Sequence, residues 1–231
     1  RNIHRPSALY YLNQGSTEES SIIENCLFED ISVTGVSRSD EIECSAFDFG
    51  ENRNIIFRNN TIQGHKLPPK EWKNLLIGRI FSIENCSFIN NQANYEGGGS
   101  GLYLSSSNSR ITNCAFIENH ANLSFAHFGG NICDGKGGAV QFGGSTQSSN
   151  SIVIEGCTFQ SNRADYEGGA ISLQCSEATI LDCIFISNEC AKQNFGNSQT
   201  NNKQGGAISF ELGSQGSSYV LQNCTISKNQ A

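Results

Sequence analysis

Cysteine is the residue type in this chain with the widest potential chemistry, because thiols form disulfides, bind metals and attack electrophiles. The 231 residues include ten cysteines and no methionine. Zinc sites commonly pair cysteines two residues apart, and no C-x-x-C pair occurs here, so we expect no metal site. Cysteine also serves as a small buried hydrophobe. Six cysteines recur at one position of a repeated phrase, which favours that role: Cys26, Cys86, Cys114, Cys157, Cys183 and Cys224.

Disulfides between such cysteines are the alternative. Strands stacked about 4.8 Å apart meet the Cα distance of a disulfide, but their parallel Cβ atoms lie farther apart than the ~3.8 Å that the bond prefers. We therefore predict a row of buried free thiols. Cys190 falls at a small inward alanine position of the repeat. Cys44, Cys133 and Cys175 lie off the row and are better disulfide candidates.

Carboxylates and histidines form no recognisable catalytic pattern. Hydrolysis of a polysaccharide needs two placed carboxyl groups, and elimination needs a calcium site beside a base. The 22 acidic residues are scattered, without an Asp-Asp pair. His120 and His127 have no Ser or Cys nucleophile at a readable spacing. We expect no enzyme, no catalytic residue and no cofactor; a carbohydrate-binding or polysaccharide-degrading protein is the alternative.

Four asparagines begin the N-glycosylation sequence Asn-x-Ser/Thr. They are Asn59, Asn85, Asn122 and Asn223. Asn122 opens an insertion, and we favour it as the acceptor if the protein is secreted. The other three fall at a corner of the repeat, where we expect asparagines to stack and where a glycan would break the stack.

Composition excludes several classes of protein. A net charge of −7 and a pI near 5.1 argue against a binder of nucleic acids or anionic membranes. No apolar run reaches the roughly 18 residues of a membrane-spanning helix. The chain is rich in turn formers, with 24 glycines, and poor in strong helix formers. The composition therefore argues against a helical fold.

A repeated phrase positions most of the residues named above. It occurs seven times, as IENCLF (23–28), FRNNTI (57–62), IENCSF (83–88), ITNCAF (111–116), IEGCTF (154–159), ILDCIF (180–185) and LQNCTI (221–226). The spacing indicates a unit of about 26–28 residues with insertions. A second phrase follows in several units, as GGAVQF (137–142), GGAISL (168–173) and GGAISF (205–210).

The first phrase predicts a strand, a sharp corner and another strand. The residue before each Cys position is Asn, Gly or Asp, the types that tolerate a left-handed backbone. Alternating apolar spacing runs up to this position and resumes out of phase after it. Such a unit cannot bury its apolar side chains alone, but stacked units build a continuous interior. We predict an all-β fold, a parallel β-helix (a solenoid) of about seven coils with inward Ile, Cys and Phe.

Two further rows follow from the spacing. Phenylalanine stands three residues after the corner in five units, at Phe28 and at the four residues for which we predict a row: Phe88, Phe116, Phe159 and Phe185. Asparagine stands six residues after the corner in five units, at Asn91, Asn119, Asn162, Asn188 and Asn229. We expect stacked asparagines to hydrogen-bond one another and the backbone, satisfying polar groups at buried corners. This structural role is favoured over sugar binding.

Two insertions occur at one corner in alternate units, at about 122–136 and 192–204. Insertions in repeat proteins tend to emerge on one face, which often binds partners. A loop folded over the surface is the alternative. The first insertion supplies four candidate partner-binding residues: Phe125, His127, Phe128 and Asp134.

The pairing of Phe-x-x-Asn (88–91, 116–119, 159–162 and 185–188) with Gly-Gly-Ala-[Ile/Val] resembles the repeat of chlamydial polymorphic outer membrane proteins. Related repeats occur in large surface proteins of some protists. The resemblance covers residues 20–231. It implies a right-handed, pectin-lyase-like parallel β-helix displayed outside the cell and associated with adhesion. The first three units depart from the pattern, since Asn60 replaces Cys and His65 replaces Asn.

We expect residues 1–231 to form a single β-helix domain, an excerpt of a longer repeat array, with less regular coils over 1–82 and regular coils over 83–231. The rival interpretation is a subunit whose bare ends stack into a filament. The expected function is that of a non-catalytic extracellular or cell-surface glycoprotein, a stiff structural rod. It would serve as an adhesin passenger or as a filament or coat component. Expected partners are neighbouring repeats or like subunits stacked end to end, and surface or matrix glycans or proteins.

Overall fold

The structure is a computed structural model. It describes residues 9–10, 21–24, 26–29, 47–48, 55–58, 61–63, 76–78, 80–94, 102–104, 108–122, 137–143, 151–165, 167–191, 205–212 and 217–231.

These residues form strands in four parallel sheets and no helix. Sheet A contains β1 (Leu9–Tyr10), β4 (Phe47–Asp48), β7 (Leu76–Gly78), β11 (Leu102–Leu104), β15 (Val140–Gly143), β19 (Ile171–Cys175) and β23 (Ile208–Leu212). Sheet B contains β2 (Ser21–Glu24), β5 (Ile55–Arg58), β8 (Ile80–Glu84), β12 (Asn108–Thr112), β16 (Ser151–Glu155), β20 (Glu177–Leu181) and β24 (Ser218–Gln222). Sheet C contains β3 (Leu27–Glu29), β6 (Thr61–Gln63), β9 (Ser87–Ile89), β13 (Ala115–Ile117), β17 (Thr158–Gln160), β21 (Ile184–Ile186) and β25 (Thr225–Ser227). Sheet D contains β10 (Gln92–Asn94), β14 (His120–Asn122), β18 (Arg163–Ala164) and β22 (Glu189–Cys190).

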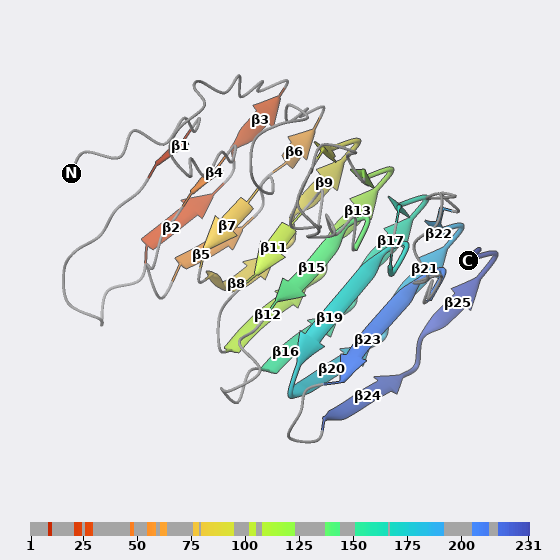
Figure 1. Cartoon of the computed structure of the whole chain (residues 1–231). Helices are drawn as coiled ribbons and strands as arrows, with labels where there is room; N and C mark the ends of the chain where they lie inside the picture. The colour runs from red at the N-terminus through yellow and green to blue at the C-terminus, as the bar shows by residue number, and fades with distance from the viewer. Residues whose placement is uncertain are drawn as a thin grey trace, which may run out of the picture.

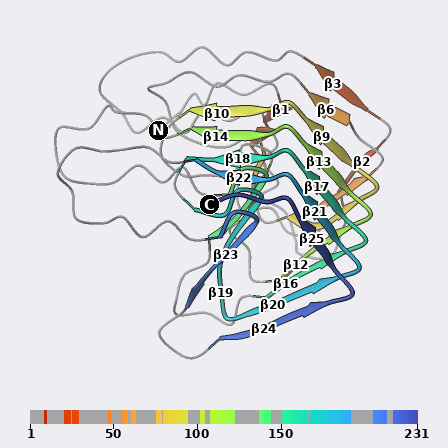
Figure 2. The ribbon, with the colours of Figure 1, turned by 90° about the vertical axis from the view of Figure 1, so that its right-hand side faces the viewer.

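The chain visits the sheets in a fixed cyclic order. From β11 onward it passes through A, B, C and D and returns to A, and each strand pairs with the corresponding strands of the turns before and after. Strands of one sheet therefore lie side by side along the molecule, with the N- and C-terminal strands at opposite ends (Figure 1). Figure 2 shows the successive turns nested behind one another. The predicted all-β class with parallel strands is confirmed, and the arrangement is compatible with a β-helix.

Strand register places equivalent residues of the repeated phrase beside one another. Ile111 pairs with Ile83 on one side and Ile154 on the other, and Phe116 pairs with Phe88 and Phe159. These side chains are fully buried in one apolar cluster. The rings of the four phenylalanines predicted to share a row stack nearly parallel, with centroids 4.7–4.9 Å apart. Offset or parallel aromatic contacts of this kind add about 0.5–1.5 kcal/mol to simple burial.

Burial ends at the last described coil. Leu221 and Ile226 occupy the same register positions as the buried Ile180 and Phe185, yet they are 45% and 48% exposed. The reason is that β24 and β25 are the outer strands of their sheets, so nothing described covers their far side. Cys26 also differs from its predicted burial, for the same reason. It was predicted to be buried in the Cys row but is exposed, next to the outermost strand β3 at the opposite end.

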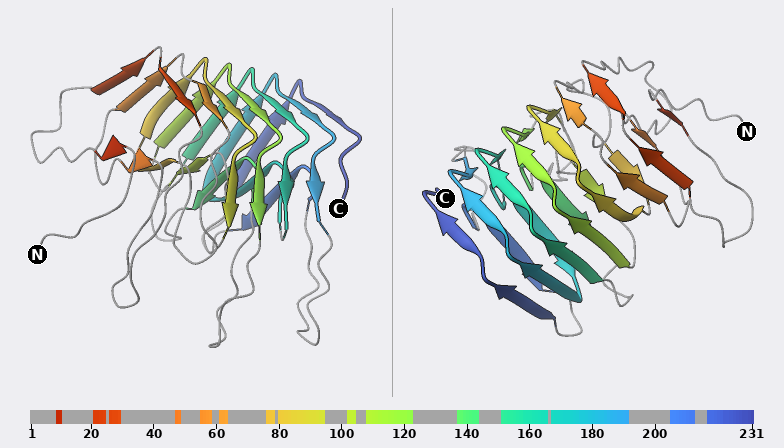
Figure 3. Two further views of the ribbon diagram at one scale, coloured as in Figure 1. Left: turned by 90° about the horizontal axis from the view of Figure 1, so that it is seen from above. Right: turned by 180° about the vertical axis from the view of Figure 1, so that it is seen from behind.

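Two sharp corners bend each regular coil, and the bends line up along the stack (Figure 3). The first lies between sheets B and C, at the position predicted for a left-handed backbone, and that prediction is confirmed. Positive φ values of 51–63° occur there at Asn85, Asn113, Gly156, Asp182 and Asn223. The second lies between sheets C and D, five residues later, at Asn90, Glu118, Ser161, Ser187 and Lys228, with φ values of 51–56°.

The Gly-Gly-Ala phrase closes each coil. The Cα of Gly169 faces the backbone of Glu189, which lies in sheet D at the end of the same turn; a Cβ on Gly169 would lie 2.6 Å from the Glu189 carbonyl carbon. That Cβ would also collide with the carbonyl oxygen of Gly206 in the next coil. Gly138 approaches the backbone of Arg163 in the same way. Only glycine allows two backbones to come this close.

Candidate functional site: two corners and the polar rows beside them

The row of Asn91, Asn119, Asn162, Asn188 and Asn229, called the Asn row below, follows the second corner. From Asn119 onward, each carboxamide oxygen in it accepts two hydrogen bonds from the asparagine of the preceding coil. Asn162 Oδ1 accepts from Asn119 Nδ2 and from the Asn119 backbone N–H, both at 3.0 Å. Asn162 Nδ2 donates to Asn188 Oδ1 at 3.0 Å and to the Phe116 carbonyl at 2.9 Å. Asn162 is fully buried.

Only a carboxamide meets these demands, since the position needs an acceptor and two donors on one short side chain. The row also relieves the strained corner before it. Each left-handed residue at that corner costs about 1–2 kcal/mol. The buried hydrogen bonds of the following asparagine offset this cost, because each buried polar group they satisfy would otherwise cost about 1–3 kcal/mol.

The cysteines beside the first corner form a second buried row. Cys157 Sγ accepts a hydrogen bond from the Cys114 backbone N–H at 3.4 Å and donates to the Glu155 carbonyl at 3.3 Å. Cys86, Cys114, Cys157 and Cys183 are all buried. Hydrogen bonds to neighbouring thiols, with burial, raise the pKa of Cys114 and Cys183 above the ordinary value.

Of the four cysteines outside the Cys row, the structure describes Cys175 and Cys190. Cys175 was a disulfide candidate, and it is a free buried thiol at the end of β19. Burial raises its pKa to about 11. Cys190 pairs in register with Ala164 in sheet D and is buried. Cys44 and Cys133 lie outside the described residues. A thiol that stays protonated is a poor nucleophile, which applies to Cys114, Cys175 and Cys183; in the same row, hydrogen bonds from the Cys114 and Cys183 thiols lower the pKa of Cys157 to about 4.

The burial predicts slow modification of the Cys row. In the native protein, an alkylating reagent should label Cys26 and Cys224 at least ~100-fold faster than Cys114 or Cys157, whose labelling requires local unfolding. Peptide mass spectrometry against reaction time measures this. Denaturation without reductant is the control and should release every row thiol for labelling. Row cysteines that react only after reduction would show disulfides instead, contrary to the structure.

The first-corner side chains contradict one expectation. They were predicted to be buried in a stack, but Asn85, Asn113, Asp182 and Asn223 are all exposed. The reason is geometric: a left-handed residue between two strands turns its side chain away from both sheets, whereas the following Cys points inward. The objection to glycosylation at Asn85 and Asn223, that a glycan would break a buried stack, therefore does not hold.

Sequence reasoning missed one ion pair beside the insertions. His120 Nε2 lies 3.2 Å from Asp165 Oδ1, and Arg163 Nε lies 3.7 Å from the same oxygen. The Asp165 side chain is 2% exposed. The pair joins residues 45 positions apart, which no local spacing indicates. Among the described residues, no group of three His, Cys, Asp or Glu side chains could hold a metal ion.

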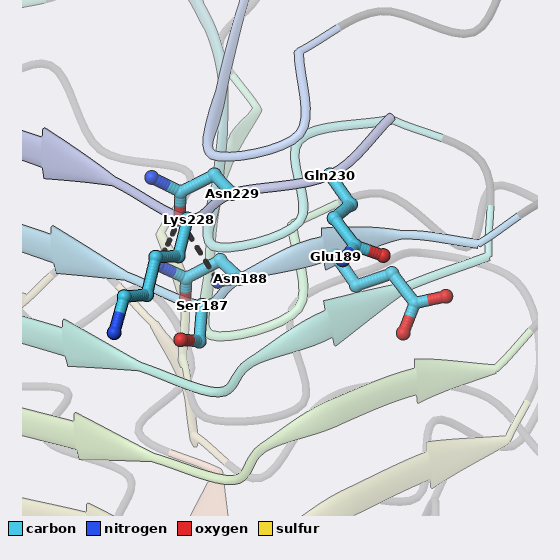
Figure 4. A pocket seen from close by; sticks show the side chains of 6 residues that line it. All are labelled: Ser187, Asn188, Glu189, Lys228, Asn229 and Gln230. Carbon is cyan, nitrogen blue, oxygen red and sulfur yellow. Dashed lines mark hydrogen bonds between the residues drawn. The ribbon is translucent and has the colours of Figure 1, made fainter.

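A shallow concavity of ≈ 610 Å³ opens over the last two coils (Figure 4). Its lining runs along the second corner from Ser187 to Glu189 and from Lys228 to Gln230. Within it, Asn188 donates to Asn229 Oδ1, the last bond of the Asn row. Lys228 and Glu189 lie on opposite sides of the lining, which lacks the pair of carboxylates that glycoside hydrolysis uses.

The predicted partner-binding residues Phe125, His127, Phe128 and Asp134 lie outside the described residues. So does Asn59. The backbone of Asn122 ends β14 in sheet D, and the insertion that follows starts there. The described part of the chain contains no apolar helix of membrane-spanning length.

One family model matches the chain. The model of the Chlamydia polymorphic membrane protein repeat matches residues 156–174. The match begins at corner residue Gly156, includes Phe159 and Asn162, and runs through the Gly168–Gly169 closure. The resemblance to this repeat is therefore confirmed for that unit. Comparison with curated proteins and with solved structures found no match.

Proposed function

We propose that the chain is a non-catalytic segment of a cell-surface protein, a right-handed parallel β-helix of about seven coils that acts as a stiff rod. The matched repeat belongs, by its name, to a membrane protein. That likeness supports display outside the cell. The proposal assigns the protein a mechanical role and assigns no chemistry to it.

The observation that carries the proposal is the continuity of the Asn row. Its hydrogen bonds link five successive coils at 2.9–3.0 Å between side chains. Parallel strand pairing runs beside it in all four sheets. A buried, fully paired polar row resists bending and sliding, because any slip leaves several buried groups unsatisfied at once.

An adhesin passenger is the first form of the proposal. Insertions 122–136 and 192–204 follow β14 and β22, two strands of sheet D. Loops held by a rigid scaffold are common binding elements. The partners would be glycans or proteins of a host surface or matrix. Antibody to the purified chain, applied to intact cells of the source organism, tests surface display; staining only after permeabilisation would contradict it.

A filament or coat component is the second form. In the regular coils each asparagine is paired with that of the next coil; the Asn188 backbone N–H, for example, donates to Asn229 Oδ1 at 2.8 Å. A coil from a like subunit stacked end to end would supply equivalent pairing, because unpaired strand edges with apolar side chains promote association.

End stacking predicts a contrast between two glutamate substitutions. Ile226→Glu places a charge on the open interior and should abolish concentration-dependent elongation. Val220→Glu is the matched control, since Val220 is 44% exposed but follows the outward alternation of β24, and elongation should survive. Sedimentation velocity over a range of concentrations measures both. A wild-type chain that stays monomeric throughout removes the filament form and leaves the adhesin form.

The enzyme alternative gains no support from the described carboxylates. Asp165, the most buried, is held by His120 and Arg163 rather than by a second acid. A polysaccharide-degrading β-helix would need two carboxyl groups facing one groove.

A further inference from the structure

Two N-glycosylation sequences lie at the first corner in a geometry that suits modification. Asn85-Cys86-Ser87 and Asn223-Cys224-Thr225 each start at the left-handed corner residue. Both asparagines are exposed. The hydroxyl residue is on the outer side as well, since Ser87 is partly exposed and Thr225 is exposed. The corner therefore presents the acceptor amide and the hydroxyl outward, with the cysteine turned inward between them.

The exposure of Asn85 is not an effect of the chain end. Its flanking strands β8 and β9 lie between β5 and β12 and between β6 and β13, so coils cover it on both sides. Asn113, one coil farther, is exposed in the same way. Exposure is thus a property of the corner, and Asn223 at the last coil shares it.

The carboxamides at the corner also differ from those of the Asn row in their bonding. Asn162 uses its oxygen and both amide hydrogens in buried bonds. Within the described part of the chain, neither Asn85 nor Asn223 makes a side-chain hydrogen bond. The Asn85 backbone N–H is separately satisfied by the Thr112 carbonyl at 3.0 Å, so the backbone needs nothing from the side chain. A glycan on Nδ2 therefore displaces no contact of the fold.

We propose that Asn85 and Asn223 carry N-linked glycans, an inference that rests on the proposed display outside the cell. In the modification, the Asn Nδ2 forms a bond to the anomeric carbon of an oligosaccharide carried on a lipid diphosphate. The bond from that carbon to the lipid diphosphate breaks, the diphosphate leaves, and the amide loses one proton. The product is a neutral, solvated chain on the edge between sheets B and C.

The placement of the glycans has a consequence for the rod. They mark the edge between sheets B and C, the two sheets that meet at the first corner. A bulky, hydrated group on this edge blocks lateral contact there. The rod would then not associate through this edge.

Peptide mapping tests the proposal directly. The chain, given a secretory leader, is produced in eukaryotic cells and digested with trypsin after enzymatic deglycosylation in H₂¹⁸O, which converts each glycosylated Asn to labelled Asp. The four sequences fall on separate tryptic peptides, 59–66, 80–110, 111–136 and 204–228. Label is expected at Asn85 and Asn223, and Ser87→Ala and Thr225→Ala should each remove one glycan without changing the asparagine.

A gain-of-site variant supplies the matched control. Ala115→Thr creates a further glycosylation sequence that starts at Asn113, at the same corner, and Ala115 is already partly exposed. In a Ser124→Ala background, which removes the Asn122 sequence, peptide 111–136 should gain one glycan. Unlabelled Asn85 and Asn223 in a secreted chain, beside a glycosylated marker protein from the same cells, would overturn the proposal. Glycan-free native protein inside its source cells would instead overturn the surface display on which the inference rests.

Discussion

Substitution of Gly169 by alanine should cost more than about 4 kcal/mol of unfolding free energy, beyond the range of most single substitutions. The added Cβ would sit 2.6 Å from the Glu189 carbonyl carbon and would collide with the Gly206 carbonyl oxygen. Both obstacles are backbone atoms, so no side-chain rotation relieves them. The coil must open between sheets A and D. Urea unfolding followed by circular dichroism measures the loss.

Gly156→Asn is the matched control for a glycine replaced by a larger residue. Gly156 has φ +63° at the first corner, where other coils already carry asparagine at 51–54°. The one atom within 3 Å of its added Cβ, among the described residues, is Asn113 Oδ1, the end of an exposed side chain that can rotate away. We expect a change of less than ~0.5 kcal/mol, as for an ordinary surface substitution. Equal stability of the two variants would contradict the backbone closure assigned to Gly-Gly-Ala.

Asn162→Ala should lower the unfolding free energy by about 3–6 kcal/mol, because it strands several buried polar groups worth roughly 1–3 kcal/mol each. The backbone N–H and Nδ2 of Asn119 lose their acceptor, and the Phe116 carbonyl loses a donor. No described group can replace the missing carboxamide at this fully buried position. The measurement is again urea unfolding, with an unchanged dependence on urea showing that the native state stays compact.

Asn229→Ala removes an identical side chain from the end of the Asn row and serves as its control. Asn188 loses its acceptors there, through bonds of 2.8 and 2.9 Å, and the Phe185 carbonyl loses a donor at 3.0 Å, so the difference from Asn162 lies in exposure. Asn229 is partly exposed, so water takes over much of the bonding, and the cost should stay near 1 kcal/mol. If Asn229→Ala lowered the unfolding free energy as much as Asn162→Ala, burial inside the row would not increase the contribution of its hydrogen bonds to stability.

The sequence predicted those parts of the fold in which the same residue types recur at the same position of every unit. Asn, Gly and Asp before each Cys indicated the first corner, because few residues tolerate a positive φ. The residue types at the second corner did not indicate a left-handed backbone. Glu118, Ser161 and Lys228 are not typical left-handed residues, and their conformation is explained only by the buried asparagine that follows each of them.

The candidate site was predictable in its composition but not in its orientation. Spacing predicted inward Cys and buried asparagines six residues after the corner, but it did not distinguish the corner residue itself, whose left-handed backbone turns the side chain outward. The first-corner asparagines were therefore expected inside and lie outside. The closure by Gly169 and the pairing of His120 with Asp165 depend on backbones and side chains meeting across a turn, and alternation along one strand carries no information about that.

The central claim is that buried asparagines continue from coil to coil as one hydrogen-bonded row inside a stack of parallel strands. A crystal structure of the full chain, at a resolution that shows side-chain amides, tests it most directly. The account predicts successive coils about 4.8 Å apart, with the carboxamides of Asn119, Asn162 and Asn188 in contact and shielded from solvent. Antiparallel pairing of these strands, or an Asn162 side chain pointing into solvent, would contradict it.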